Sequence, residues 1–87
     1  MIIPKHLQIF ADPVQLSDKD YERLKPLISS WSTTLNEILA ETCEADLERL
    51  LVIELMTAKR EHMTNRLVAR LSTARREALS AKVKELL

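Results

Sequence analysis

The chain has 87 residues, 46% of them hydrophobic, and its thirteen Lys and Arg residues balance its thirteen Asp and Glu residues. This length fits one domain, and the hydrophobic content argues against an intrinsically disordered chain. The complete absence of glycine excludes glycine-rich phosphate-binding loops and glycine helix caps. Because Leu, Ala, Glu, Arg and Lys are abundant, the sequence predicts a single all-α domain over residues 1–87.

The zero net charge hides an uneven distribution of charge along the chain. Residues 1–58 contain ten acidic and five basic residues, so this part carries about −5. Residues 59–87 contain three acidic and eight basic residues, so this part carries about +5. Such an asymmetry points to a charged partner, or to self-association between unlike faces. The eight basic residues are Lys59, Arg60, Arg66, Arg70, Arg75, Arg76, Lys82 and Lys84.

The first sixteen residues differ in pattern from the rest of the chain. Polar and apolar residues alternate from Lys5 to Ile9, and Pro4 and Pro13 lie on either side of this stretch. An alternation with a period of two is typical of an extended strand. Because a single strand is not stable alone, we expect residues 1–16 to form an N-terminal extended arm. It should pack on the helices or pair with a second chain.

Three to four helices are predicted over residues 17–87. Ser17 is a good N-cap for a short first helix, which Pro26 should end. Pro26 also suits the first turn of a second helix over residues 26–42, and a third helix should begin near Glu44. We expect the second and third helices to form an antiparallel helical hairpin core. Its core residues should be Leu35, Ile38, Leu39, Leu47, Leu51 and Leu55.

The apolar face of the chain changes direction after the start of the third helix. The segment 44–56 is apolar almost all round, as expected for a central buried helix. Further along, apolar residues repeat on a face about 150° away. The helix either breaks near Thr64-Asn65, which we favour, or continues with its two halves packed on different partners. We expect the second face to drive homo-oligomerisation, most simply into a dimer. Its residues are Met63, Leu67, Leu71, Ala74 and Ala78.

Basic residues flank this second apolar face. Regularly spaced cations can neutralise phosphates along a nucleic-acid backbone, although they can also be solvated or meet an acidic protein surface. The acidic group between residues 41 and 48 of a second subunit would provide such a surface. On a continuous helix, four of the cations would align within about 40°: Lys59, Arg66, Arg70 and Lys84. The predicted binding residues are Lys59, Arg66, Arg70, Arg75, Arg76 and Lys84.

No arrangement of residues points to catalysis or to metal binding. His6 and His62 lack metal-ligand spacing, and the acidic group between residues 41 and 48 is interpreted as a solvated helix start. Cys43 is the only cysteine, and we expect a small buried side chain there. The sequence therefore predicts a protein that is not an enzyme and takes no metal, cofactor or small-molecule substrate. No segment approaches the length of a membrane span, so we expect no membrane partner and a cytoplasmic location.

Residues 50–79 combine regularly spaced leucines with Glu54, Lys59-Arg60, Arg66-Leu67 and Arg70-Leu71. In this respect the segment resembles short all-helical proteins encoded in tailed-phage genomes. The resemblance covers about a third of the chain and implies an accessory role in phage assembly, DNA packaging or regulation. The first predicted function is a non-enzymatic, homo-oligomeric interaction or assembly module. The alternative is a nucleic-acid-binding regulatory or DNA-packaging protein that uses the basic C-terminal helix.

Overall fold

The described part of the chain is all-helical. A computed structural model describes residues 2–28 and 35–86 and contains no strand among them. The prediction of an all-α fold is confirmed, whereas the predicted number of three to four helices is wrong. The described residues form a short 3-10 helix, η1 (Lys5–Leu7), and six α-helices: α1 (Gln8–Ala11), α2 (Asp18–Ile28), α3 (Leu35–Glu41), α4 (Glu44–Met56), α5 (Glu61–Ala69) and α6 (Thr73–Leu86).

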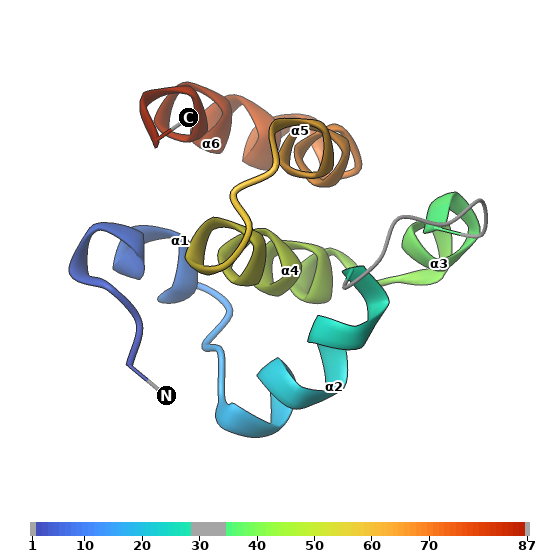
Figure 1. Cartoon of the computed structure of the whole chain (residues 1–87). Helices are drawn as coiled ribbons and strands as arrows, with labels where there is room; N and C mark the ends of the chain where they lie inside the picture. Colours follow the sequence, from blue (N-terminus) through green and yellow to red (C-terminus); the bar gives the residue numbers. More distant parts are fainter. Residues whose placement is uncertain (1, 29–34, 87) are drawn as a thin grey trace.

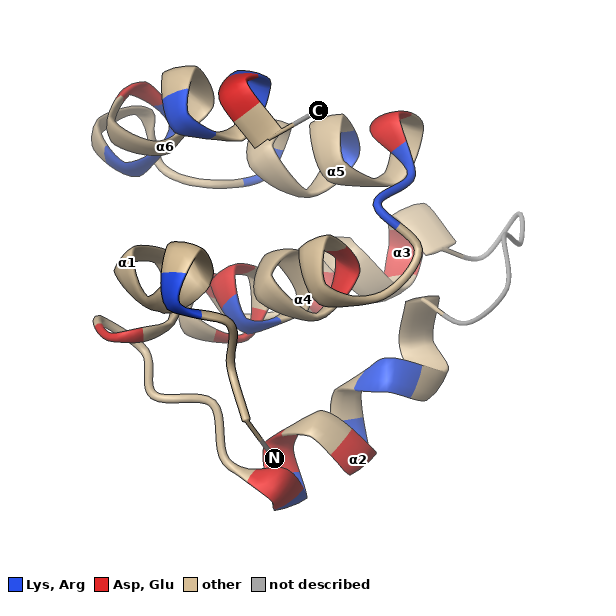
Figure 2. Ribbon diagram, turned by 60° about the vertical axis from the view of Figure 1, so that its left-hand side comes forward, with Lys and Arg blue, Asp and Glu red and all other residues tan. Residues whose placement is uncertain are grey.

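The helices are arranged around α4 (Figure 1). Figure 2 shows α5 and α6 as one layer, α1 and α4 as the next, and α2 on the far side of α4. The main neighbours of α4 are accordingly α5, α2 and α1. The predicted antiparallel hairpin, in which the helix before α4 is its main partner, is therefore not confirmed.

The core surrounds α4 on all sides, as its sequence predicts. Leu50, Leu51, Val52 and Ile53 follow one another and are all fully buried. Four consecutive residues point in four directions around a helix, so this helix must be covered on every face. Of the residues predicted for the hairpin core, Ile38 is only half-buried. The other five are buried as predicted: Leu35, Leu39, Leu47, Leu51 and Leu55.

The N-terminal segment is helical where an extended arm was predicted. Residues 5–11 form η1 and α1, and Leu7, Phe10 and Ala11 are buried. These three residues follow the i, i+3, i+4 spacing of a helix face, which outweighs the alternation seen from Lys5 to Ile9. Because the segment is helical, Ile9 lies on the side opposite the buried residues and is half exposed.

The predicted cap of α2 is confirmed, but its predicted end is wrong. The Ser17 hydroxyl accepts the Asp20 backbone N–H at 3.2 Å and donates to the Asp20 carboxylate at 3.0 Å, which is a reciprocal cap. Pro26 lies within the last turn of α2 and does not begin a new helix. The predicted helix over residues 26–42 also includes residues 29–34, which lie outside the described part. Within that range, α3 begins at Leu35.

The chain breaks twice after α4, and neither break lies at the position near Thr64-Asn65 that the sequence favours. α4 ends at Met56, and Lys59 adopts a φ of 50° while its backbone N–H donates to the Glu54 carbonyl oxygen at 2.8 Å. This left-handed residue takes the place of the missing glycine cap. A second break, at residues 70–72, separates α5 from α6. Thr64 lies inside α5, so a break near Thr64-Asn65 is wrong.

Candidate binding surface around the C-terminal helices

The loop before α5 is held by an ion pair with a buried carboxylate of α4. Glu54 has no exposed surface, and its Oε1 and Oε2 accept N–H groups of the Arg60 guanidinium at 2.7 and 3.1 Å. Oε2 also accepts the backbone N–H of Arg60 at 2.8 Å. The hydrogen bond to Glu54 raises the pKa of Arg60. Because Arg60 also donates to the Ile28 carbonyl oxygen at 2.6 Å, this one side chain joins α2, α4 and α5.

Two further carboxylates of α4 hold the start of α6. Glu48 is buried, and its Oε1 accepts two N–H groups of Arg75 at 2.6 and 3.1 Å. Glu44 accepts the backbone N–H of Ser72, just before α6, at 2.8 Å. The bond to Glu48 raises the pKa of Arg75, and the bond to Ser72 lowers the pKa of Glu44. Glu44 and Glu48 are four residues apart, so they lie on one face of α4.

These contacts neutralise part of the charge asymmetry within the chain. Glu48 and Glu54 belong to the acidic part, and their partners Arg75 and Arg60 belong to the basic part. Without these two pairs, the charges of about −5 and +5 fall to about −3 and +3. Arg75 was predicted to contact an external partner, and the structure instead places it against Glu48 with 33% of its side chain exposed.

The remaining predicted binding cations lie around the α5–α6 layer. Arg66 donates a hydrogen bond to the Asn36 side chain of α3. The other four are exposed, and their side chains have no hydrogen bond or ion pair with a residue of the described ranges. The single row predicted for Lys59, Arg66, Arg70 and Lys84 on a continuous helix does not form, because the chain turns at residues 57–60 and 70–72. We call the four exposed cations the basic surface: Lys59, Arg70, Arg76 and Lys84.

The predicted oligomer interface is divided between the core and the surface. Met63 and Leu67 have no exposed area, and Leu71 is 5% exposed. These three side chains therefore form part of the core of one chain and are not presented to a second copy. Ala74 and Ala78 are exposed on α6. From the sequence alone, the second apolar face has no partner within the chain. In the structure its partner is α4, because α5 packs on α4.

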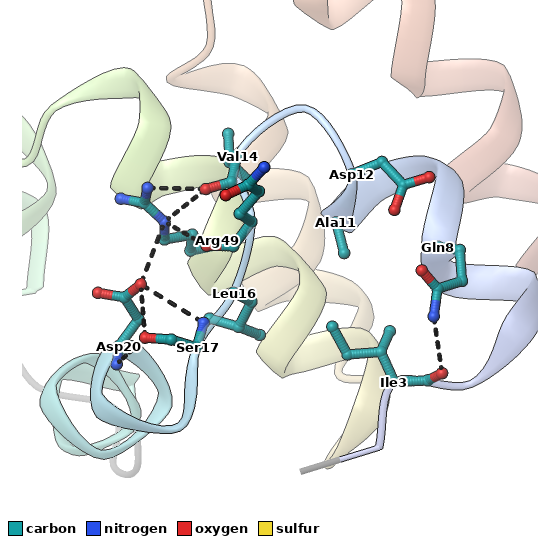
Figure 3. A pocket seen from close by; sticks show the side chains of 10 residues that line it. Ile3, Gln8, Ala11, Asp12, Val14, Leu16, Ser17, Asp20 and Arg49 are labelled. Carbon is teal, nitrogen blue, oxygen red and sulfur yellow. Dashed lines mark hydrogen bonds and ion pairs between the residues drawn. The ribbon is translucent and has the colours of Figure 1, made fainter.

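A second charged cluster, which the sequence did not indicate, fixes the N-terminal part to α4. Arg49 donates to the Val14 carbonyl oxygen at 2.7 Å (Figure 3) and to the Asp46 carboxylate at 2.7 Å. Asp46 also accepts two hydrogen bonds from Arg23 of α2 at 3.0 Å. The hydrogen bond from Arg23 lowers the pKa of Asp46 to about 2. Arg49 and Asp46 are three residues apart on α4, but the contacts Arg23–Asp46 and Arg49–Val14 join residues 23 and 35 apart in sequence, so no local pattern could reveal those two contacts.

The hollow in Figure 3 shows no constellation for catalysis. It has a volume of about 500 Å³, and its lining includes Gln8, Asp12, Asp20 and Arg49. Asp20 bonds to Ser17 and Arg49 bonds to backbone carbonyl oxygens, so the polar groups shown there largely satisfy one another. Among residues 2–28 and 35–86, no three His, Cys, Asp or Glu side chains gather as a metal site would need.

Two other sequence expectations concern the thiol and the membrane. Cys43 is exposed at the N-cap of α4, so the expectation that it is buried is wrong. None of the described helices combines the length and the apolar character needed to cross a membrane.

Comparisons with protein-family models, with curated proteins and with solved structures give no match to this chain. The resemblance of residues 50–79 to phage proteins therefore stays a prediction.

Proposed function

We propose that the chain is a non-enzymatic nucleic-acid-binding module that contacts the phosphate backbone through the basic surface. One observation carries this proposal. The buried carboxylates of α4 engage Arg60 and Arg75, whereas the four cations of the basic surface are exposed and have no side-chain partner in the described part of the chain. Unpaired Lys and Arg side chains are the groups that bind phosphate oxygens and release counterions.

The two arginines of the basic surface lie close in sequence to the start of α6. Arg70 caps α5 and Arg76 lies in the first turns of α6. The forked guanidinium matches two phosphate oxygens. The N-terminal end of α6 adds a partial positive charge, but Glu44 already accepts the Ser72 N–H there. We therefore expect the two arginines, rather than the helix end, to dominate binding, with little preference for base sequence.

Assembly through an apolar face, the first function predicted from the sequence, loses its main support. Three of the five residues of that face belong to the core of one chain. The nucleic-acid alternative keeps four of its six predicted residues on the surface. A role in packaging or regulating phage DNA is compatible with this proposal, and neighbouring genes for capsid, portal or terminase proteins would support it.

Removing the two arginines should weaken binding to duplex DNA. We expect the Arg70→Ala/Arg76→Ala variant to bind a labelled duplex of mixed sequence about tenfold or more weakly at low salt. The slope of log affinity against log salt should become shallower by about 2, because about two phosphate contacts are lost. Fluorescence anisotropy across a salt series measures both quantities.

The matched control removes two cations from the other part of the chain. Lys5 and Lys19 are exposed and, like the basic surface, have no side-chain partner in the described part. The Lys5→Ala/Lys19→Ala variant changes the net charge equally and should keep nearly full affinity and an unchanged salt slope. Absence of binding by the unmodified chain at low salt, or equal losses in the two variants, would contradict the proposal.

A further inference from the structure

Helix α1 presents a large apolar side chain to solvent. Ile9 is 50% exposed, whereas Leu7 and Phe10 on the same segment are buried. In the described part of the chain, Ile2 is the other large hydrophobic residue that is exposed, at 91%. Ile2 precedes η1, but Ile9 lies on a helix that packs against α4. An apolar side chain held in place on a packed helix is suited to anchor a protein contact.

Ile9 lines a groove between α1 and the C-terminal end of α6. The groove has a volume of about 340 Å³. Lys82 and Glu85 of α6 are its exposed charged residues, and the exposed side chain of His6 also lines it. The side chains of Lys82 and Glu85 form no hydrogen bond or ion pair with another described residue. The apolar part of the groove is lined by Ile9, Phe10 and Leu86.

We propose that this groove is the contact surface for a second copy of the chain, related to the first by a twofold axis. Lys82 and Glu85 have opposite charges and are three residues apart on one helix. A twofold axis passing between them runs the second α6 antiparallel to the first. Lys82 then lies beside Glu85 of the partner subunit, and Glu85 lies beside the partner's Lys82.

This charge complementarity favours an identical copy over an unrelated protein. A surface with one positive and one negative residue in this order is complementary in charge to an antiparallel copy of the same surface. Because Ile9 lines the same groove as Lys82 and Glu85, we expect Ile9 of each chain to pack on the groove of the other, which would remove its exposed half from water. The contact lies apart from the predicted interface of Met63, Leu67 and Leu71. The dimer contact involves Lys82 and none of the residues of the basic surface. The dimer proposal therefore holds whether or not the chain binds nucleic acid.

Sedimentation equilibrium from low to high micromolar concentration tests the proposal. We expect the unmodified chain to dimerise, and the Ile9→Ser variant to raise the dimer dissociation constant about tenfold or more. The matched control is Ile2→Ser, which removes an even more exposed isoleucine outside the groove and should leave dimerisation unchanged. Circular dichroism should show that both variants keep their helical content, because both side chains are solvent-exposed.

Charge variants provide a second test that does not touch the apolar residues. Lys82→Glu alone and Glu85→Lys alone should each weaken the dimer, because each places like charges side by side across the axis. The double variant Lys82→Glu/Glu85→Lys should restore it. A monomer at every concentration, an equal effect of Ile2→Ser and Ile9→Ser, or a double variant weaker than both single variants would overturn the proposal.

Discussion

Replacing Arg60 with Leu should lower the free energy of unfolding by about 3 kcal/mol. Glu54 is fully buried, and within residues 2–28 and 35–86 every hydrogen bond to its carboxylate comes from Arg60. The variant keeps the backbone N–H but removes the guanidinium, so a buried carboxylate loses its counter-charge. The Ile28 carbonyl oxygen also loses its donor. For a domain of this size, such a loss lowers the melting temperature by more than about 10 °C. Urea unfolding followed by circular dichroism measures it.

The companion variant removes both members of the pair. Glu54→Leu/Arg60→Leu replaces the ion pair with apolar groups, and we expect it to recover much of the lost stability, because no buried charge remains. A loss below about 1 kcal/mol for Arg60→Leu alone would mean that Glu54 is solvated or paired in another way. A double variant less stable than Arg60→Leu would contradict the interpretation that the unpaired carboxylate is the cause.

Replacing Leu67 with Ala should destabilise the single chain by about 2–5 kcal/mol. Leu67 has no exposed area and lies on α5, the main neighbour of α4. Its removal therefore loses buried apolar area and leaves a cavity between the two helices. The measurement is urea unfolding at a protein concentration low enough to keep the chain monomeric.

The control for this variant is Ala78→Ser, because Ala78 belongs to the same predicted face but is exposed. We expect its effect to stay within about 0.5 kcal/mol. If Leu67→Ala instead left the stability of the monomer unchanged and weakened only self-association, Leu67 would be an interface residue as the sequence suggested. That result would contradict the packing of α5 described above.

The parts of the fold that depend on near neighbours in sequence could be predicted. The central position of α4 follows from four consecutive buried apolar residues, which only a covered helix can accommodate. The cap of α2 follows from Ser17 and Asp20, which are three residues apart. In both cases the residues that decide the structure lie within one or two helical turns of one another.

The breaks in the chain were harder to predict because no glycine marks them. Lys59 takes the left-handed conformation after α4, a conformation that glycine adopts most readily. Without such a marker, the change of apolar face between residues 56 and 63 fits a break at several positions. The segment 5–11 shows the same difficulty. Its first five residues alternate like a strand, and only Phe10 and Ala11 reveal the helix.

The sequence could predict which cations the candidate surface draws on, but not how they are arranged or paired. The sequence identifies the cations of residues 59–87, but it does not tell which of them meet a carboxylate. Glu48 and Arg75 are 27 residues apart, and their contact depends on how α6 lies against α4. The groove at Ile9 was missed for the same reason, since it combines α1 with the opposite end of the chain.

The most direct test is a double-mutant cycle on Glu48 and Arg75, because it asks whether the charge asymmetry is partly satisfied within one chain. The cycle measures the free energy of unfolding of Glu48→Arg, Arg75→Glu and the double variant. We expect each single variant to be destabilised and the exchanged pair to recover stability, with an interaction energy of about 1–2 kcal/mol. An interaction energy of zero, which means that the two single changes in unfolding free energy simply add in the double variant, would contradict this pairing. It would also contradict the assignment of the unpaired cations to an external partner.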